Sequence, residues 1–179
     1  MDRQIVLLRG INLGPRNRIA MPELRKLLEG AGFADVRTYV QSGNIVLSTR
    51  RNPESTATAC EELIAAELGL EIPAVVRTRD ELAEVVRRNP LAGVADDPKR
   101  YQVSFLDGEP DPRALEKLSA AAVDGERMEA IGREIYAWHP HGIARSKMWA
   151  AALAGKDLGV KATARNWTTV TTLLQMAEE

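Results

Sequence analysis

The chain of 179 residues carries 24 Lys and Arg against 25 Asp and Glu, and 45% of its residues are hydrophobic. This length and apolar content exclude a disordered chain and allow one substantial core or two small ones. The single cysteine excludes a disulfide framework and a zinc knot within one chain, and the lack of an apolar run of about 18 residues excludes a spanning helix. We therefore expect a cytoplasmic protein with no membrane association.

The first 77 residues predict the element order β-α-β-β-α-β. Pro22 suits the first turn of a helix, and β-rich runs on both sides of Ser42-Gly43-Asn44 indicate a hairpin. The expected elements are a strand at 5–8, a helix from about 21 to 30, strands at 36–40 and 45–47, a helix at 53–68 and a strand at 72–76.

Residues 78–98 are expected to connect this unit to a second one. Thr78 and Glu81 have the spacing of a capping box at a helix start, and a stretch rich in Pro, Gly and Asp follows at 89–98. The elements expected beyond it are a strand at 101–106, a helix capped by Asp111, strands at 127–131 and 134–138, a helix from Ser146 to Gly155, a strand at 160–164 and a helix from about Trp167.

The order β-α-β-β-α-β therefore recurs over 99–165. The sequence predicts an α+β fold of two tandem ferredoxin-like units with mainly antiparallel sheets and an extra C-terminal helix. The predicted units span 1–77 and 99–179, and their shared order of elements indicates a duplication.

Polar side chains are expected to converge in the first unit. Its first two strands should run parallel, so the loop after the first strand and the hairpin between the second and third share one end of the sheet. Arg9 and Asn12 should then lie near Gln41, Ser42 and Asn44, whose forked donors and amides suit a phosphate, a carboxylate or a nucleotide. The alternative is that Asn and Gly only satisfy tight turns and Arg9 pairs with a local carboxylate.

The charge distribution favours an anionic ligand at this end. Residues 1–51 hold nine Lys and Arg against four Asp and Glu, whereas residues 52–179 hold fifteen against twenty-one. Arg16 and Arg18 lie in the same loop as Arg9, just before a helix N-terminus, which is weakly positive. The near-zero net charge of the chain therefore hides a basic first segment.

Four segments carry a family resemblance. They are Leu-Leu-Arg-Gly-Ile-Asn-Leu-Gly at 7–14, Met21-Pro-Glu-Leu24, Thr-Tyr-Val-Gln-Ser-Gly-Asn-Ile-Val at 38–46, and Thr-Ala-Arg-Asn-Trp-Thr-Thr-Val at 163–170. Together they resemble the uncharacterised bacterial domain-of-unknown-function family numbered 1697. The resemblance implies an α+β fold built from ferredoxin-like parts and brings no established substrate, catalytic residue or cofactor.

The last of these segments adds two candidate ligand-binding residues. Arg165 and Asn166 are expected to open the last helix, where Arg165 could reach an anion at the helix start. The alternative is an ordinary helix that Asn166 caps.

No group in the sequence predicts catalysis or metal binding. His139 and His141 supply two metal ligands at most, so we expect this pair in an exposed loop. Ser146 and Lys147 are adjacent on a helix and do not face each other, which makes Ser146 a predicted N-cap. Cys60 falls on an apolar helical face and is expected to be a buried structural thiol.

The sequence thus predicts a binding module for a small anionic ligand, such as a nucleotide or a phosphorylated metabolite, with no cofactor and no metal. A weak hydrolase or transferase acting in the same cleft is the alternative, so whether the chain is an enzyme stays open. A further alternative, which the sequence favours less, is a nucleic-acid or partner-binding surface on the basic first unit. The oligomeric state is left open. The predicted ligand-binding residues are Arg9, Asn12, Gln41, Ser42, Asn44, Arg165 and Asn166.

Overall fold

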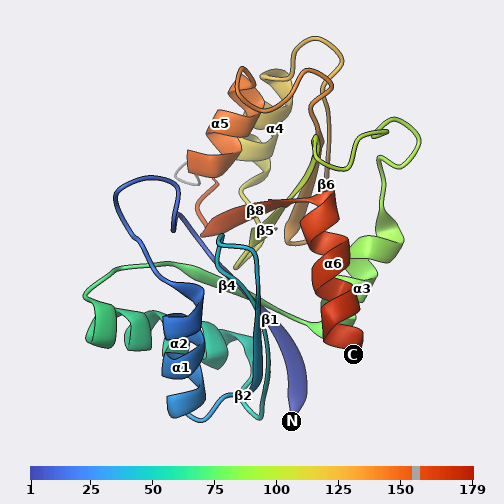
Figure 1. The fold of residues 1–179 in the computed structure, drawn as a ribbon. Coiled ribbons are helices and arrows are strands. Elements are labelled where there is room, and N and C mark those ends of the chain that lie inside the picture. Colours follow the sequence, from blue (N-terminus) through green and yellow to red (C-terminus); the bar gives the residue numbers. More distant parts are fainter. Residues whose placement is uncertain (155–157) are drawn as a thin grey trace. The chain divides into compact units, whose positions relative to one another are not determined.

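The computed structural model describes residues 1–154 and 158–179, which form six helices and two four-stranded antiparallel sheets (Figure 1). The fold is therefore α+β, as predicted. Two compact units divide these residues: unit 1 is Met1–Ala83 with Leu173–Glu179, and unit 2 is Glu84–Thr172. Within the described residues, no helix combines the length and the apolar character that a membrane span requires.

Unit 1 contains the first sheet, in the strand order β2-β3-β1-β4. Its elements are β1 (Asp2–Leu8), α1 (Met21–Gly30), β2 (Ala34–Tyr39), β3 (Asn44–Thr49), α2 (Pro53–Leu68), β4 (Ala74–Thr78), the first half of α3 (Arg79–Arg88) and the second half of α6 (Trp167–Glu178). Strands β1 and β2 both pair antiparallel with β3, so they run parallel to each other. The β1–α1 loop and the β2–β3 turn therefore lie at one end of the sheet, as predicted.

One face of this sheet packs against α1 and α2. Alternate residues of β1 and β3 face the helices, because successive side chains of a strand point to opposite faces. Helix α1 contributes residues four apart, and so does α2, which puts each pair on one helical face. The resulting core includes Val6, Leu8, Leu24, Leu28, Ile45, Leu47, Cys60 and Ile64, all buried.

Unit 2 repeats this arrangement, with the strand order β6-β7-β5-β8. Its elements are the second half of α3, β5 (Tyr101–Leu106), α4 (Pro112–Ala120), β6 (Arg127–Ile131), β7 (Glu134–Trp138), α5 (Lys147–Ala154), β8 (Ala162–Asn166) and the first half of α6. Its core includes Leu106, Leu118, Ile135, Met148 and Leu158. The prediction that Gly155 ends α5 lies outside the described residues.

Backbone hydrogen bonds at the end of each central strand match between the two units. In both units, the backbone amide of the last residue of β1 or β5 donates to a carbonyl group of the neighbouring hairpin turn. The amide of the next residue donates to the carbonyl group of the residue just before β4 or β8. The bonds are Leu8 N to Gly43 O (2.9 Å) and Arg9 N to Pro73 O (2.9 Å) in unit 1, and Leu106 N to Arg133 O (2.9 Å) and Asp107 N to Lys161 O (3.1 Å) in unit 2. These matches give a residue-by-residue correspondence between the units.

The predicted helix caps are confirmed. Glu81 N donates to Thr78 Oγ1 (3.1 Å) while Thr78 N donates to Glu81 Oε2 (2.8 Å), so both halves of the capping box form. Asp111 Oδ1 accepts from Arg113 N (2.9 Å), and Ser146 Oγ accepts from Trp149 N (3.0 Å). These side chains satisfy amide groups that a helix start leaves without intrahelical partners.

Candidate functional site

Asn12 joins the two connections at the predicted end of the unit 1 sheet. Its Nδ2 donates to Gln41 O (2.7 Å) and Ile19 O (2.9 Å), and its Oδ1 accepts from Ile19 N (2.9 Å). The φ angle of Asn12 is 53°, in the left-handed region that Asn tolerates better than most residues. We call residues 9–20 and 40–43 the loop pair, because this one side chain holds both segments together.

The longer segment of the loop pair, the dark blue connection between β1 and α1 in Figure 1, is also tied internally. Asn12 N donates to Asn17 O (3.1 Å), Asn17 Nδ2 donates to Gly10 O (3.3 Å), and Arg18 Nε donates to Gly14 O (3.1 Å). This segment contains three arginines and no carboxylate, and Arg16 and Arg18 are exposed. The result is an ordered, positively charged loop.

The shorter segment packs closely against β1. Gly43 has a φ of +76°, and a Cβ atom there would lie 2.6 Å from the Cβ of Leu8. Asn44 is fully buried and its Nδ2 donates to Tyr39 O (3.2 Å), whereas Gln41 and Ser42 are exposed at the tip. Asn12 and Asn44 thus make the turn contacts that the alternative interpretation expected, and their role in ligand binding stays a prediction.

The same connections are much shorter in unit 2. The β1–α1 loop has twelve residues and its counterpart between β5 and α4 has five; the β2–β3 turn has four residues and its counterpart, Gly132-Arg133, has two. Both units nevertheless close the same backbone hydrogen bonds at this end of the sheet. The fold therefore does not require the extra residues that unit 1 carries here.

Arg165 and Asn166 belong to unit 2 and lie on β8, opposite Val103 and Gln102. The strand predicted at 160–164 is thus displaced to 162–166, and Arg165 is a strand residue. Its Nη1 donates to Thr163 Oγ1 and to Ala164 O, both at 2.8 Å, and burial lowers the pKa of Arg165 to about 10. Asn166 Oδ1 accepts from Thr169 N (2.9 Å), which confirms Asn166 as a cap of α6.

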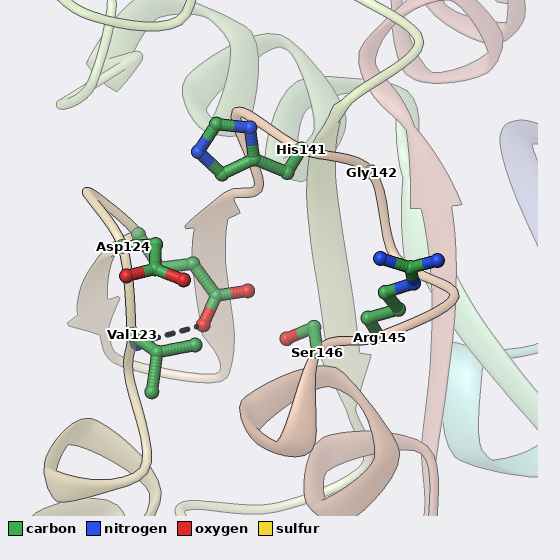
Figure 2. Close-up of a pocket in the computed structure, with 7 residues that line it drawn as sticks. Val123, Asp124, His141, Gly142, Arg145 and Ser146 are labelled. Atoms are coloured by element: carbon green, nitrogen blue, oxygen red, sulfur yellow. Dashed lines mark hydrogen bonds between the residues drawn. The ribbon is translucent and has the colours of Figure 1, made fainter.

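A second polar site, which the sequence analysis missed, lies within unit 2 (Figure 2). A cavity of about 340 Å³ opens between the α4–β6 and β7–α5 connections. Its lining residues are Val123, Asp124, Glu126, His141, Gly142, Arg145 and Ser146. We call this cavity the unit 2 pocket.

Glu126 is the buried carboxylate of the unit 2 pocket. It accepts hydrogen bonds from Val123 N (3.1 Å), from the Nδ1 atom of His139 (2.8 Å) and from the Ser146 hydroxyl. Burial alone would raise the pKa of Glu126, but these three hydrogen bonds together outweigh burial and leave that pKa below its ordinary value. The carboxylate is therefore held ionised at neutral pH.

His139 corrects the expectation that both histidines lie in an exposed loop. Its side chain is fully buried, stands edge-on to Trp149 with ring centroids 5.5 Å apart, and bonds Glu126, whereas His141 is exposed. Glu126, His139 and Ser146 are separated by thirteen and seven positions, a spacing that matches no familiar motif. Only the hairpin of β6 and β7 brings the first two together.

Two further candidates for chemistry are the Cys60 thiol and a metal site. Cys60 is buried, and burial raises its pKa to about 12, which confirms the prediction of a structural thiol. Within residues 1–154 and 158–179, no group of three or more His, Cys, Asp or Glu side chains is arranged to hold a metal ion.

Comparison with known proteins identifies the family and the fold. A family model described as a protein of unknown function (DUF1697) matches residues 1–136. The chain has no match among curated proteins. A solved structure, that of the conserved bacterial protein SP0830 from Streptococcus pneumoniae, is similar with a TM-score of 0.80 and 20% sequence identity, over 98% of each chain. At this identity the likeness concerns the fold.

Proposed function

The chain belongs to the DUF1697 family of proteins of unknown function, and we propose that it binds a small anionic ligand, such as a nucleotide or a phosphorylated metabolite, at the loop pair of unit 1. The observation that carries this proposal is the elaboration of both connections at one end of the unit 1 sheet. Unit 2 closes the same sheet end with five residues and two residues where unit 1 uses twelve and four. Loops longer than their fold requires are commonly functional.

The chemistry of the loop pair supports an anion. Arg9, Arg16 and Arg18 offer planar guanidinium groups, and the segment from residue 9 to residue 20 contains no Asp or Glu. The exposed Gln41 adds amide donors at the tip of the neighbouring turn.

The start of α1 adds the partial positive charge of a helix N-terminus at the end of this loop, beside one carboxylate in its first turn, Glu23. The N-cap of α1 is Ala20, which makes no side-chain capping bond, whereas α2 and α4 are capped by Asn52 and Asp111. The first amide groups of α1 therefore have no capping side chain, and they add to the partial positive charge of the helix N-terminus.

The proposal is tested by ligand screening followed by arginine substitution. Phosphate, pyrophosphate, ATP and a set of sugar phosphates are screened by thermal shift, and any compound that stabilises the protein is titrated by calorimetry. Hydrogen bonds to charged groups contribute about 1.5–3 kcal/mol each, so Arg9→Ala and Arg16→Ala should each weaken binding roughly tenfold or more.

Arg50→Ala is the matched control, because Arg50 is an exposed arginine of the same unit that follows β3 at the opposite end of the sheet. It should leave the affinity unchanged. If no anionic compound binds, or if Arg9→Ala and Arg16→Ala bind like the unsubstituted protein, the loop pair is not an anion site.

We also propose that the segments 1–77 and 99–179, joined by 78–98, are ferredoxin-like domains that arose by duplication. The order β-α-β-β-α-β in both units supports this, and so do the equivalent strand orders β2-β3-β1-β4 and β6-β7-β5-β8. The matching hydrogen bonds at the ends of β1 and β5 add independent support.

A further inference from the structure

We propose that the unit 2 pocket is a second binding site and that it takes a small zwitterion of the amino-acid class, with the ligand's ammonium group beside Asp124 and Glu126 and its carboxylate beside Arg145. The site lies wholly within unit 2 and does not depend on the proposed function of the loop pair in unit 1. Four observations support it: the buried carboxylate, the charges around the pocket, the size of the cavity, and the length of the α4–β6 connection compared with its counterpart in unit 1.

The carboxylate of Glu126 is buried and held in place by hydrogen bonds. Removing an ionised carboxylate from water is costly unless the charge is paired and hydrogen-bonded. Here the side chain of Glu126 is only 6% exposed and receives three hydrogen bonds, from a backbone amide, a buried histidine and a helix-capping serine. Ser146 can serve both α5 and Glu126, because its oxygen accepts from Trp149 N while its proton is donated to the carboxylate. Such a network fixes the position of one negative charge at the pocket wall.

Two further charged side chains, Asp124 and Arg145, line the cavity. Figure 2 shows Asp124 on one side of the pocket and Arg145 on the other, with His141 between them at the rim. Within the part of the chain that the structure describes, the side chains of Asp124 and Arg145 make no ion pair or hydrogen bond with another residue. Asp124 comes from the same short connection as Glu126, so the negative groups share one wall and the guanidinium stands on the other.

This separation of charge selects the class of ligand. An anion without a positive group would gain at Arg145 but would face two carboxylates, and a cation without a negative group would gain at the carboxylates but face a guanidinium. A zwitterion places each of its charges beside the opposite charge, and a guanidinium binds a carboxylate with two parallel hydrogen bonds. The cavity volume of about 340 Å³ is at the small end of ligand pockets, which suits a molecule of amino-acid size.

The correspondence between the units supports a specialised role for this pocket. In unit 1, the connection between α1 and β2 runs only from residue 31 to residue 33, whereas the corresponding α4–β6 connection, residues 121–126, supplies three pocket residues. Each unit therefore extends a different connection, and in each the added residues carry charged or amide side chains.

The two histidines of the chain make the proposal directly testable by NMR. The protein has only two, His141 lines the pocket and His139 bonds Glu126, so both imidazole ring signals report on this site. The full-length protein is titrated in turn with L-glutamate, L-glutamine, L-leucine and L-arginine, and His141→Asn assigns the two signals. We expect at least one amino acid to shift the His141 ring signal in a saturable manner.

Blocked derivatives of that amino acid test the charge assignment. The N-acetyl form lacks the ammonium group and the carboxamide form lacks the carboxylate, so each should bind at least tenfold more weakly. Asp124→Asn should weaken binding by a similar factor, and so should Arg145→Gln. Glu129→Gln and Arg113→Gln, which change exposed residues of unit 2 outside the pocket, should have no effect.

The proposal is overturned if none of the four amino acids shifts the His141 signal, or if the blocked derivatives bind as tightly as the parent compound. It is also overturned if Asp124→Asn and Arg145→Gln bind like the unsubstituted protein. Both positions are exposed, so these substitutions are not expected to unfold the chain. Arg9→Ala serves as a separate control: it removes a loop-pair cation and should leave amino-acid binding unchanged, so the two sites can fail independently.

Discussion

Asn12 carries much of the connection between the two segments of the loop pair. Its side-chain amide donates to Ile19 O and accepts from Ile19 N, and it also donates to Gln41 O on the neighbouring turn. A side chain with both a donor and an acceptor is required, because two of its partners are carbonyl groups and the third is an N–H group. Asn12 therefore determines where the arginines of the longer segment are held.

Replacing Asn12 by Ala should destabilise the protein by about 2–3 kcal/mol, since three hydrogen bonds are lost and typical bonds contribute about 1 kcal/mol each. Asn17→Ala is the matched control: Asn17 has nearly the same φ, 52° against 53°, but its side chain makes one hydrogen bond, of 3.3 Å. That control should cost about 1 kcal/mol. Urea unfolding of the three proteins measures the difference, and equal losses would show that the three hydrogen bonds of Asn12 together contribute no more than the single bond of Asn17.

Glu126 should make the stability of the protein depend on acidity. Its pKa in the folded protein is below the ordinary value of 4.5, so its stabilising contribution is present above that pH and is lost as the pH falls through the folded pKa. Glu126→Gln should therefore cost about 1–3 kcal/mol at pH 7, and this cost should shrink below about pH 4.5.

Chemical unfolding of the unsubstituted protein and Glu126→Gln at pH 7, 5, 4 and 3 measures this effect. Glu129→Gln is the control, because Glu129 is an exposed carboxylate on β6, close in sequence to Glu126. It should change stability little at any pH. A cost of Glu126→Gln that stays constant from pH 7 to pH 3 would contradict an ionised, hydrogen-bonded carboxylate.

For individual residues, hydrogen bonds to nearby backbone amides could be predicted from the sequence, whereas bonds between residues far apart in the sequence could not. The caps at Thr78, Asp111 and Ser146 follow from side chains that bond amides two or three residues away, so their spacing is visible in the sequence. The bond between Glu126 and His139 depends on the register of a hairpin, in which Arg127 lies opposite Trp138. No local pattern encodes that register.

Among the secondary-structure elements, the β2–β3 turn is the most tightly constrained part of the loop pair. Gly43 combines a positive φ with a backbone position against Leu8. Gly43→Ala should cost about 2–4 kcal/mol, because the left-handed conformation costs roughly 1–2 kcal/mol for a residue with a Cβ atom and the contact at 2.6 Å adds the cost of overpacking.

Gly10→Ala separates these two causes. Gly10 has a similar φ of +69°, but a Cβ atom added there would meet nothing within 4 Å, so this control should cost only about 1–2 kcal/mol. Thermal or urea unfolding gives both values. If the two substitutions cost the same, the close approach to Leu8 has no energetic weight.

The order of elements could be predicted because hydrophobic period and capping residues are local signals, but the bounds of two strands could not, and these two strands are displaced by two residues toward the C-terminus. The strand predicted at 72–76 lies at 74–78, and Ile72 is buried outside it. The strand predicted at 160–164 lies at 162–166 because Arg165, a polar residue, is buried in the sheet. A run of apolar residues indicates which residues are buried, whereas the bounds of a strand depend on its hydrogen bonds with a neighbouring strand.

On the scale of the whole molecule, the two units carry different sets of charged side chains at their candidate sites. The loop pair of unit 1 holds cations without carboxylates, whereas the unit 2 pocket holds both signs of charge. The convergence of the unit 1 segments could be predicted because it follows from strand direction alone. The unit 2 pocket could not, because it requires the path of two connections whose sequence has no regular period.

Residues 173–179 belong to unit 1 although they follow unit 2 in the sequence. Arg37 on β2 forms an ion pair with Glu179 (Nη1 to Oε2, 2.7 Å), and its Nη2 donates to Met176 O. During synthesis, the ribosome releases residues 173–179 only after all of unit 2 has been made. Unit 1 can therefore acquire these contacts only after the residues of unit 2 have been synthesised, although its sheet is complete by Thr78.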